Sequence, residues 1–184
     1  MLDTLITSKT RIKLLLKFFL NSNASSYLRN LEGEFGESTN GIRLELNKFE
    51  KAGLLISRIA GNKKLYSANT EHPLFNDIHN ILLKYIGIDQ IISKVINKLG
   101  GVKKVYLVGS FANGIDSEVI DLLLVGNDIN REYLARLTAR GEGMISRKIR
   151  YLVYTDEEFK NVKSSYKSDE ILLLWTENGG KPSE

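Results

Sequence analysis

Apolar residues recur at helical spacing three times in the first part of the chain, each time after residues that cap helices. Ser8 begins the first series, whose apolar positions are Ile12, Leu15, Leu16 and Phe19. After a polar break at 21–26, Ser25 or Ser26 begins a second, which carries Tyr27, Leu28, Leu31 and Phe35 and stops at Gly36. Ser38 begins a third, which carries Ile42, Leu44, Leu46 and Phe49 and stops at Gly53. The pattern predicts three short helices.

Strand-like segments follow the third helix. Residues 54–59 read as a strand, 60–63 as a tight turn and 64–68 as a returning strand. Three short helices followed by a two-stranded hairpin predict a winged helix-turn-helix.

A helical region that is apolar on more than one side runs from Leu74 to Leu99, with an interruption at Gly87. A helix of this kind has to be covered. It packs between the two halves of the chain, or it pairs with its copy in a dimer.

After Gly100 and Gly101 the pattern changes to that of a sheet with helices. We expect strands at 102–108, 119–125 and 148–154, a short helix after the turn at Gly109 and Ser110, a helix near 133–144, and a short apolar element at 169–175. The expected fold class is therefore α+β or α/β. Its parts are a winged helix-turn-helix at 1–70, a helical connector or dimerisation region at 71–100, and a mixed sheet with helices at 101–184.

The charge is distributed unevenly between these parts. Residues 1–70 hold 11 Lys and Arg against 6 Asp and Glu, whereas residues 71–184 hold 15 against 16, which together give the net charge of +4. A basic first part joined to a neutral remainder is typical of a nucleic-acid-binding module with a second function attached. A small basic domain that arose by chance is the alternative.

Composition excludes several classes of protein. The chain has no cysteine, which excludes disulfides, thiolate zinc sites and a thiol nucleophile. The longest apolar run, 14–20, contains Lys17 and is too short to cross a bilayer. The first residues do not have the pattern of a signal peptide. We therefore expect a cytoplasmic protein with no membrane partner.

The third predicted helix holds the residues with which a helix-turn-helix reads DNA, because the second helix of that motif lies in the major groove. Its candidate contacts to bases and phosphates are Ser38, Thr39, Asn40, Arg43, Asn47 and Lys48. Ser38 and Thr39 are equally explained as helix caps. Arg43 is the stronger candidate, because it projects from among Ile42, Leu44 and Leu46, which we expect to face the core.

The predicted hairpin has a basic tip. Arg58, Asn62, Lys63 and Lys64 surround its turn and are well placed for backbone phosphates of double-stranded DNA. The alternative is a hairpin tip that is merely solvated.

The segment from Ser38 to Leu46, together with Leu54 and Leu55 after Gly53, resembles the arsenical-repressor-like winged-helix transcriptional regulators. The resemblance covers roughly residues 8–70. Members of that group often sense metals through cysteines, which are missing here. His72 and His79 lie seven positions apart without nearby partners, so we expect ordinary surface residues and no metal site.

A second resemblance lies in the sheet part. The segment from Val105 to Gly114, followed by Asp121 to Val125, resembles the nucleotidyltransferases of the DNA polymerase beta superfamily. The resemblance implies that Gly109 and Ser110 form the turn that holds a nucleotide triphosphate. It also implies that Asp121 is the second member of an Asp-x-Asp pair that binds two magnesium ions.

The chain departs from that family at the metal ligands. The first aspartate of the pair is replaced by Val119, and the strand that should carry the third carboxylate has Arg150 instead. Glu118 is expected on the opposite face and Asp116 in a loop. One carboxylate cannot balance two magnesium ions and a triphosphate, so we expect a vestigial Asp121, no metal and no cofactor, with Mg²⁺ only if the transferase is active. Arg150 then offsets phosphate charge in a possible nucleotide site with Gly109, Ser110 and Asp121.

The segments 68–75 and 82–87 resemble the connector of microbial proteins that fuse a winged helix to a nucleotidyltransferase-like domain. The leading hypothesis is a homodimeric, DNA-binding transcriptional regulator, whose degenerate second domain acts as a sensor or interaction module. One alternative is an active transferase that modifies a protein or small molecule. Another is an antitoxin-like partner of a toxin.

Overall fold

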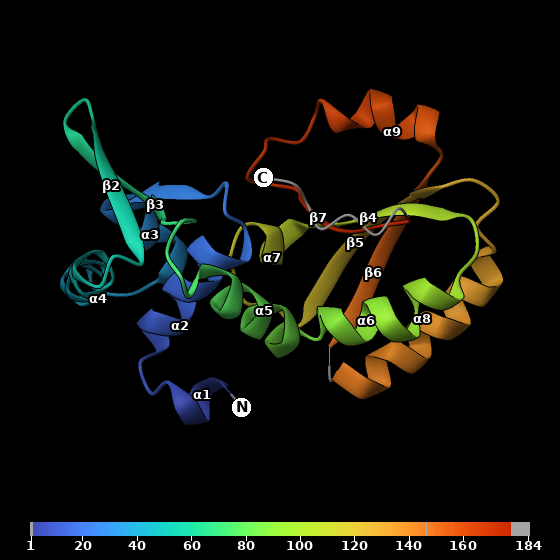
Figure 1. The fold of residues 1–184 in the computed structure, drawn as a ribbon, viewed down its shortest axis with the longest axis horizontal. Helices are drawn as coiled ribbons and strands as arrows, with labels where there is room; N and C mark the ends of the chain where they lie inside the picture. Colours follow the sequence, from blue (N-terminus) through green and yellow to red (C-terminus); the bar gives the residue numbers. More distant parts are fainter. Residues whose placement is uncertain (1, 146, 178–184) are drawn as a thin grey trace. The chain divides into compact units, whose positions relative to one another are not determined.

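The computed structural model describes residues 2–145 and 147–177, and it divides the chain into two compact units (Figure 1). Unit 1 contains residues 1–85 together with the short segment 113–116. Unit 2 contains residues 86–112 and 117–184. The first division falls inside the predicted connector, at the end of its first helix.

Unit 1 has helices around a small antiparallel sheet. Its helices are α1 (Leu2–Leu5), α2 (Lys9–Leu15), a π-helical turn (Leu16–Leu20), α3 (Leu28–Phe35), α4 (Thr39–Lys51) and α5 (Phe75–Ile86). Its strands are β1 (Ser25–Tyr27), β2 (Leu55–Ala60) and β3 (Lys63–Ala68), in the order β1-β3-β2. Helices α3 and α4 followed by the β2–β3 hairpin form the predicted winged helix-turn-helix (Figure 1).

Local sequence explains most of the helix ends. Ser8 caps α2 by accepting a hydrogen bond from the backbone of Arg11, and Ser38 caps α4 in the same way from Gly41. Gly36 ends α3 in the left-handed conformation, as predicted. The prediction that Ser25 or Ser26 caps α3 was wrong, because both lie in β1 and the residue before the helix is Tyr27.

The core of unit 1 is centred on the continuous stretch from Leu14 to Leu20, which is buried on all sides. Phe19 contacts Phe49 edge to face and also packs against Phe75. Lys17 is buried within this stretch, where its ammonium forms an ion pair with Glu34 at 2.8 Å and donates to the carbonyl of Asn113 at 3.1 Å. The segment 113–116 therefore completes unit 1 by supplying a partner for a buried charge.

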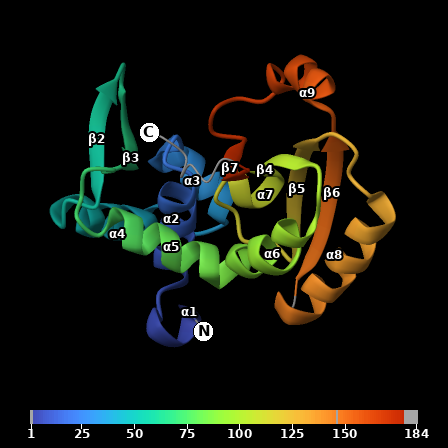
Figure 2. The same cartoon turned by 45° about the vertical axis from the view of Figure 1, so that its right-hand side comes forward.

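Unit 2 is a four-stranded sheet with helices on both faces (Figure 2). Its strands are β4 (Val102–Val108), β5 (Val119–Gly126), β6 (Lys148–Tyr154) and β7 (Leu172–Thr176), in the order β6-β5-β4-β7. Only the β5–β6 pair is parallel. Its helices are α6 (Ile88–Lys94), a 3₁₀ turn (Ile96–Lys98), α7 (Gly109–Ala112), α8 (Arg131–Ile145) and α9 (Asp156–Lys163).

The two faces of this sheet are covered differently. Helices α6 and α8 lie side by side on one face, whereas α9 lies on the other (Figures 1 and 2). On the α9 face Phe159 stacks on Tyr106 and packs in a cluster with Val108, Leu123 and Val125. Alternation along β5 places Asp121 on this same face, two residues before Leu123.

The predicted fold class is confirmed, since both units mix helices with a sheet. The predicted strands of the second part and the break of the connector at Gly87 are also confirmed. Helix α9 was not predicted. Within the described residues, no helix is long and apolar enough to cross a membrane.

Candidate functional site

A shallow groove of about 520 Å³ lies between α3, the first half of α4 and the wing strand β3. Five of the side chains predicted to contact DNA line this groove, namely Thr39, Arg43, Asn47, Lys63 and Lys64. They come from two elements that are separated in sequence by the strand β2. The fold therefore brings the predicted reading helix and the predicted basic tip to one surface.

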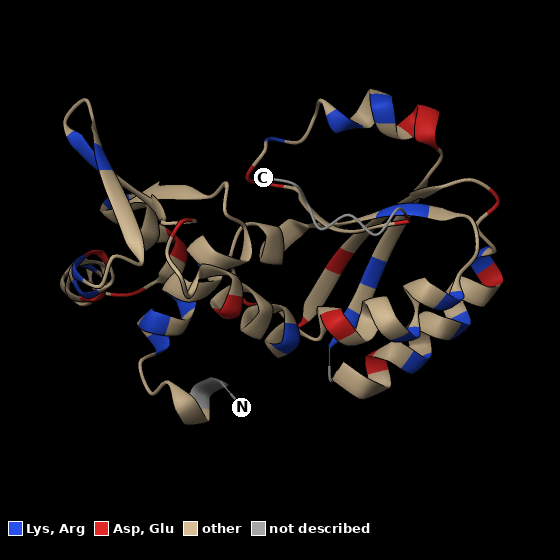
Figure 3. Cartoon of the chain, viewed as in Figure 1, with Lys and Arg blue, Asp and Glu red and all other residues tan. Residues whose placement is uncertain are grey.

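The groove is basic. Its charged residues are Arg29, Arg43, Lys63 and Lys64, with Glu32 as the single acid among the described residues that line it. Lys and Arg positions occur on both α4 and the hairpin, and α4 also carries acidic positions (Figure 3). A surface of this charge attracts the phosphate backbone of a nucleic acid.

The wing lysines are held by neighbours rather than being merely solvated. The ammonium of Lys63 lies 4.2 Å from the centre of the Tyr27 ring. Lys64 forms an ion pair with Glu50 at 2.7 Å, and Glu50 also accepts a hydrogen bond from Ser57. The hydrogen bond to Glu50 raises the pKa of Lys64, so this lysine keeps its charge but shares it with a carboxylate. Lys63 is thus the better placed of the two for a phosphate.

Helix α4 turns Arg43 outward while the core holds the helix from the other side. Ile42, Glu45, Leu46 and Phe49 are its buried positions. The expectation that Leu44 faces the core was wrong, because this side chain is 55% exposed. The reason is helical geometry: positions 42, 45, 46 and 49 share one face at 3.6 residues per turn, and position 44 cannot join them.

The other predicted DNA contacts lie around this groove or away from it. Ser38 and Asn40 are exposed at the start of α4, and Arg58 and Asn62 are exposed on the wing. Lys48 instead lines a different cavity, where its ammonium forms an ion pair with Glu45 at 2.9 Å.

Sequence reasoning missed five of the residues that line the groove, among them two tyrosines and an arginine. Tyr27, Arg29 and Tyr66 all line it. Tyr66 lies within a predicted strand and Tyr27 within a predicted helix, so the pattern indicated that both side chains belong to the core. Arg29 directly follows Leu28 at the start of α3. Its positive charge was the one feature of the sequence that could have indicated a contact to phosphate.

A second candidate site lies in unit 2, where α7 begins at the end of β4. Gly109 adopts a left-handed conformation with φ of +68°, and the carboxylate of Asp121 occupies the space where a β-carbon of residue 109 would lie. A side chain at position 109 would collide with that carboxylate. Ser110 follows in the first turn of α7 and is half-buried. Three of the four predicted nucleotide-site residues are thus adjacent.

The fourth residue, Arg150, neutralises Asp121. The two residues face each other across the parallel β5–β6 pair, and the guanidinium donates from Nε to Oδ1 of the carboxylate. This contact raises the pKa of Arg150. The charge predicted to meet a phosphate is therefore already paired with an acid.

The residues present do not fit the two magnesium ions that the resemblance implies. Val119 lies on the Asp121 side of β5, where the first ligand would be needed. The partner strand offers the cation Arg150, and Asp116 accepts a hydrogen bond from Tyr85 within unit 1. Among the described residues, no group of three or more His, Asp or Glu side chains could hold a metal ion.

The two histidines have local roles. His79 is not a plain surface residue: its Nδ1 lies 2.8 Å from the carbonyl oxygen of Phe19, and its ring stacks on Phe75. His72 accepts a hydrogen bond at Nδ1 from the backbone of Leu74. His72 lies just before α5, and His79 lies in its first half.

No protein-family model matches the chain, and no curated protein matches it. Among solved structures, a proposed nucleotidyltransferase from Sulfolobus solfataricus is 24% identical, with a TM-score of 0.37, over 55% of this chain and 86% of that one. A predicted DNA-binding transcriptional regulator from E. coli is 22% identical, with a TM-score of 0.36, over 45% of this chain and 83% of that one. Reduced HlyU from Vibrio cholerae is 14% identical, with a TM-score of 0.36, over 45% and 82%.

Proposed function

We propose that the chain is a regulator of transcription that binds double-stranded DNA through the groove of unit 1. The observation that carries this proposal is the groove itself, where Arg43 and Asn47 of α4 lie beside Lys63 of the wing. In a helix-turn-helix the residues of the second helix read bases, and the basic wing binds phosphates.

The test is a selection of bound DNA from a genomic pool, followed by affinity measurements with variants of the full chain. Arg43→Ala should lose about 1–3 kcal/mol of discrimination between the selected site and a mismatched site, as expected for a bidentate contact to a base. Arg140→Ala is the matched control, because Arg140 is exposed on α8 of unit 2. If no genomic fragment is retarded at low salt, the proposal is wrong.

A second variant separates phosphate contact from base contact. Lys63→Ala should weaken binding to all sequences alike and reduce the slope of log affinity against log salt by about 1. Lys51→Ala, at the exposed end of α4, should leave that slope unchanged. A sequence-dependent loss in Lys63→Ala would contradict the assignment of the wing to phosphates.

For unit 2 we propose a role without nucleotidyl transfer, as a sensor or an interaction module. Two features support it: Val119 stands where a metal ligand is needed, and Arg150 is paired with Asp121. The transferase reading makes a different prediction. Label from ATP, GTP, CTP or UTP would be incorporated into protein or small molecules of an extract, and incorporation would disappear in Asp121→Ala.

We also propose that the DNA-binding form is a homodimer, since one winged helix offers few base contacts and regulators of this class read two half-sites. Light scattering at micromolar concentration should give about twice the 20.8 kDa of one chain. A species of the single-chain mass would contradict the dimer.

A further inference from the structure

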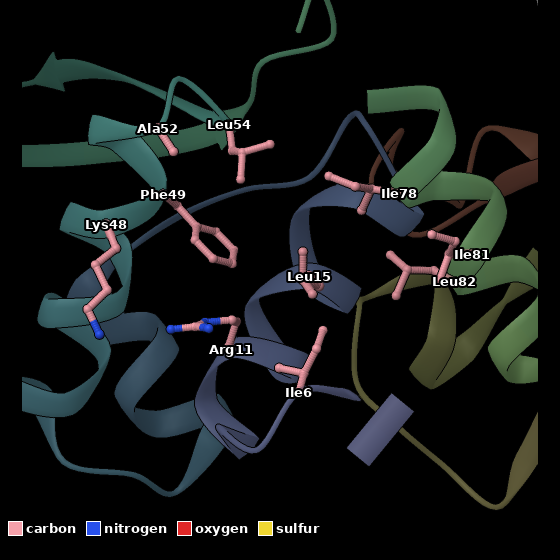
Figure 4. A pocket seen from close by; sticks show the side chains of 10 residues that line it. All are labelled: Ile6, Arg11, Leu15, Lys48, Phe49, Ala52, Leu54, Ile78, Ile81 and Leu82. Atoms are coloured by element: carbon pink, nitrogen blue, oxygen red, sulfur yellow. The ribbon is translucent and has the colours of Figure 1, made fainter. Parts of the chain in front are cut away.

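Unit 1 contains a second cavity, which uses other residues of α4 than the groove does. It measures about 440 Å³, and side chains from α2, α4 and α5 converge on it (Figure 4). Eight of the ten side chains that line it are apolar, among them Leu15, Phe49 and Leu82. Cavities of this size, mostly apolar with a few polar groups, are the usual form of small-molecule sites.

The two other lining residues are the cations Arg11 and Lys48, and both are bound to one acid. Arg11 donates to Glu45 from Nε at 2.9 Å and from Nη2 at 3.3 Å, and Lys48 donates at 2.9 Å. Burial raises the pKa of Glu45, but the hydrogen bonds from Arg11 and Lys48 outweigh this effect and lower it below the ordinary value of 4.5. Glu45 is therefore ionised at neutral pH, and the cluster has a net charge of +1.

The cations also keep unused hydrogen-bonding capacity. An arginine has five N–H donors and a lysine has three, of which this cluster directs three at Glu45. The side chains of Arg11 and Lys48 are 39% and 60% exposed, so an incoming ligand can reach them. The wall therefore combines a large apolar surface with donors that favour an anion.

From this combination we propose that the cavity binds a small amphipathic carboxylate, whose apolar body fills the space between α2, α4 and α5 and whose carboxylate pairs with Arg11 and Lys48. Charge complementarity selects this occupant, since a cationic amphiphile would be repelled and a neutral one would accept only weaker hydrogen bonds that no charge assists. A nucleoside triphosphate does not match a wall that is mostly apolar. The site is independent of the proposed DNA groove, and its test contains no DNA.

The experiment titrates the full chain with decanoate, decylamine and decanol below their aggregation concentrations, with calorimetry as the readout. Decanoate should bind one molecule per chain, at least about tenfold more tightly than either of the other two, because its carboxylate adds charge-assisted hydrogen bonds. Equal affinity for the three compounds, or no binding of decanoate, would overturn the proposal.

Two pairs of variants locate the site. Lys48→Gln should weaken decanoate about fivefold or more and leave decanol unchanged, whereas Lys51→Gln, which lies outside the cavity on the same helix, should behave as the wild type. Ile81→Glu places an acid in the wall and should abolish decanoate binding. Leu74→Glu is its matched control, because Leu74 is 53% exposed and Ile81 is 50% exposed, but only Ile81 lines the cavity.

Circular dichroism verifies that each variant is folded. Decanoate binding that survives both Lys48→Gln and Ile81→Glu would show that the compound binds elsewhere and would overturn the proposal. A second result would also overturn the proposal: the wild type is a dimer that does not bind decanoate, and Ile81→Glu is a monomer. In that case a second copy of the chain would cover this side of the cavity.

Discussion

The groove of unit 1 and the Gly109–Asp121 site of unit 2 both contain an exposed arginine, but the two arginines are in opposite situations. Arg43 lies in a groove with three further cations and one acid, and it has no ion pair or hydrogen bond among the described residues. Arg150 donates to Asp121, which is nearly buried beneath it. The groove of unit 1 thus keeps the charge of Arg43 available for a partner, whereas in unit 2 the charge of Arg150 is neutralised by Asp121.

The difference teaches that a motif is a weaker guide to chemistry than the charge balance around it. In unit 2 the glycine turn and one aspartate are present, yet the neighbouring strand supplies a cation where metal coordination needs a carboxylate. In unit 1 the motif and the charge balance agree. Three predictions sharpen or break this comparison.

The largest effect is expected from variants that destabilise the core of one unit at a time. Phe19→Ala removes a fully buried ring that contacts Phe49 and Phe75, and it should cost unit 1 about 3–5 kcal/mol of unfolding free energy. DNA binding should then be lost at a lower temperature than in the wild type. Phe159→Ala makes a similar cavity in unit 2 and should leave that temperature unchanged. Equal effects of the two variants on DNA binding would break the comparison.

A smaller effect is expected from restoring a carboxylate in unit 2. Val119→Asp should raise the affinity for Mg²⁺ or Mn²⁺ at least about tenfold, because two carboxylates on one side of β5 can share a cation. Calorimetric titration measures this change. Val119→Asn, which has the shape without the charge, is the control. An unchanged affinity in Val119→Asp would mean that the pairing of Arg150 with Asp121 controls the site more strongly than the missing ligand does.

The smallest effect is expected from acid, through Glu45 of unit 1. The folded pKa of this carboxyl lies below its ordinary value of 4.5, so the unfolded chain binds the proton more readily. The resulting stabilisation is fully present above that value and is lost as the pH falls through the folded pKa. Glu45→Gln should therefore be less stable than the wild type at neutral pH, and the difference should shrink in acid. Denaturant unfolding at a series of pH values measures this, and a difference that grows in acid would contradict it.

Helix ends and strands of this fold were predictable where a local rule decides them. Ser8, Ser38 and Gly36 end or begin their helices as expected, and β4 and β6 have their expected bounds. Helix α9 carries a local signal that was overlooked, since Thr155 and Glu158 form a reciprocal capping box.

Other features depend on contacts between distant residues, which spacing alone does not reveal. Ser25 and Ser26 read as helix caps, but pairing with Ser67 and Tyr66 of β3 draws them into a strand. The same limit applies to the candidate sites. The chain indicates that position 150 is not an acid, whereas its pairing with Asp121 follows only from the strand register.

Unit 1 is built from two separate segments of the chain, and this limits how the chain can be divided. Unit 1 ends at residue 85 and resumes for residues 113–116, where Asn113 accepts the hydrogen bond of the buried Lys17. The polypeptide therefore passes between the units three times, and no single cut releases both of them whole. A break after residue 85 leaves the first fragment without its last four residues. A gene that encodes this chain therefore cannot be split at one point into two complete modules. A single recombination event that replaced one unit would also replace, or leave behind, a segment of the other.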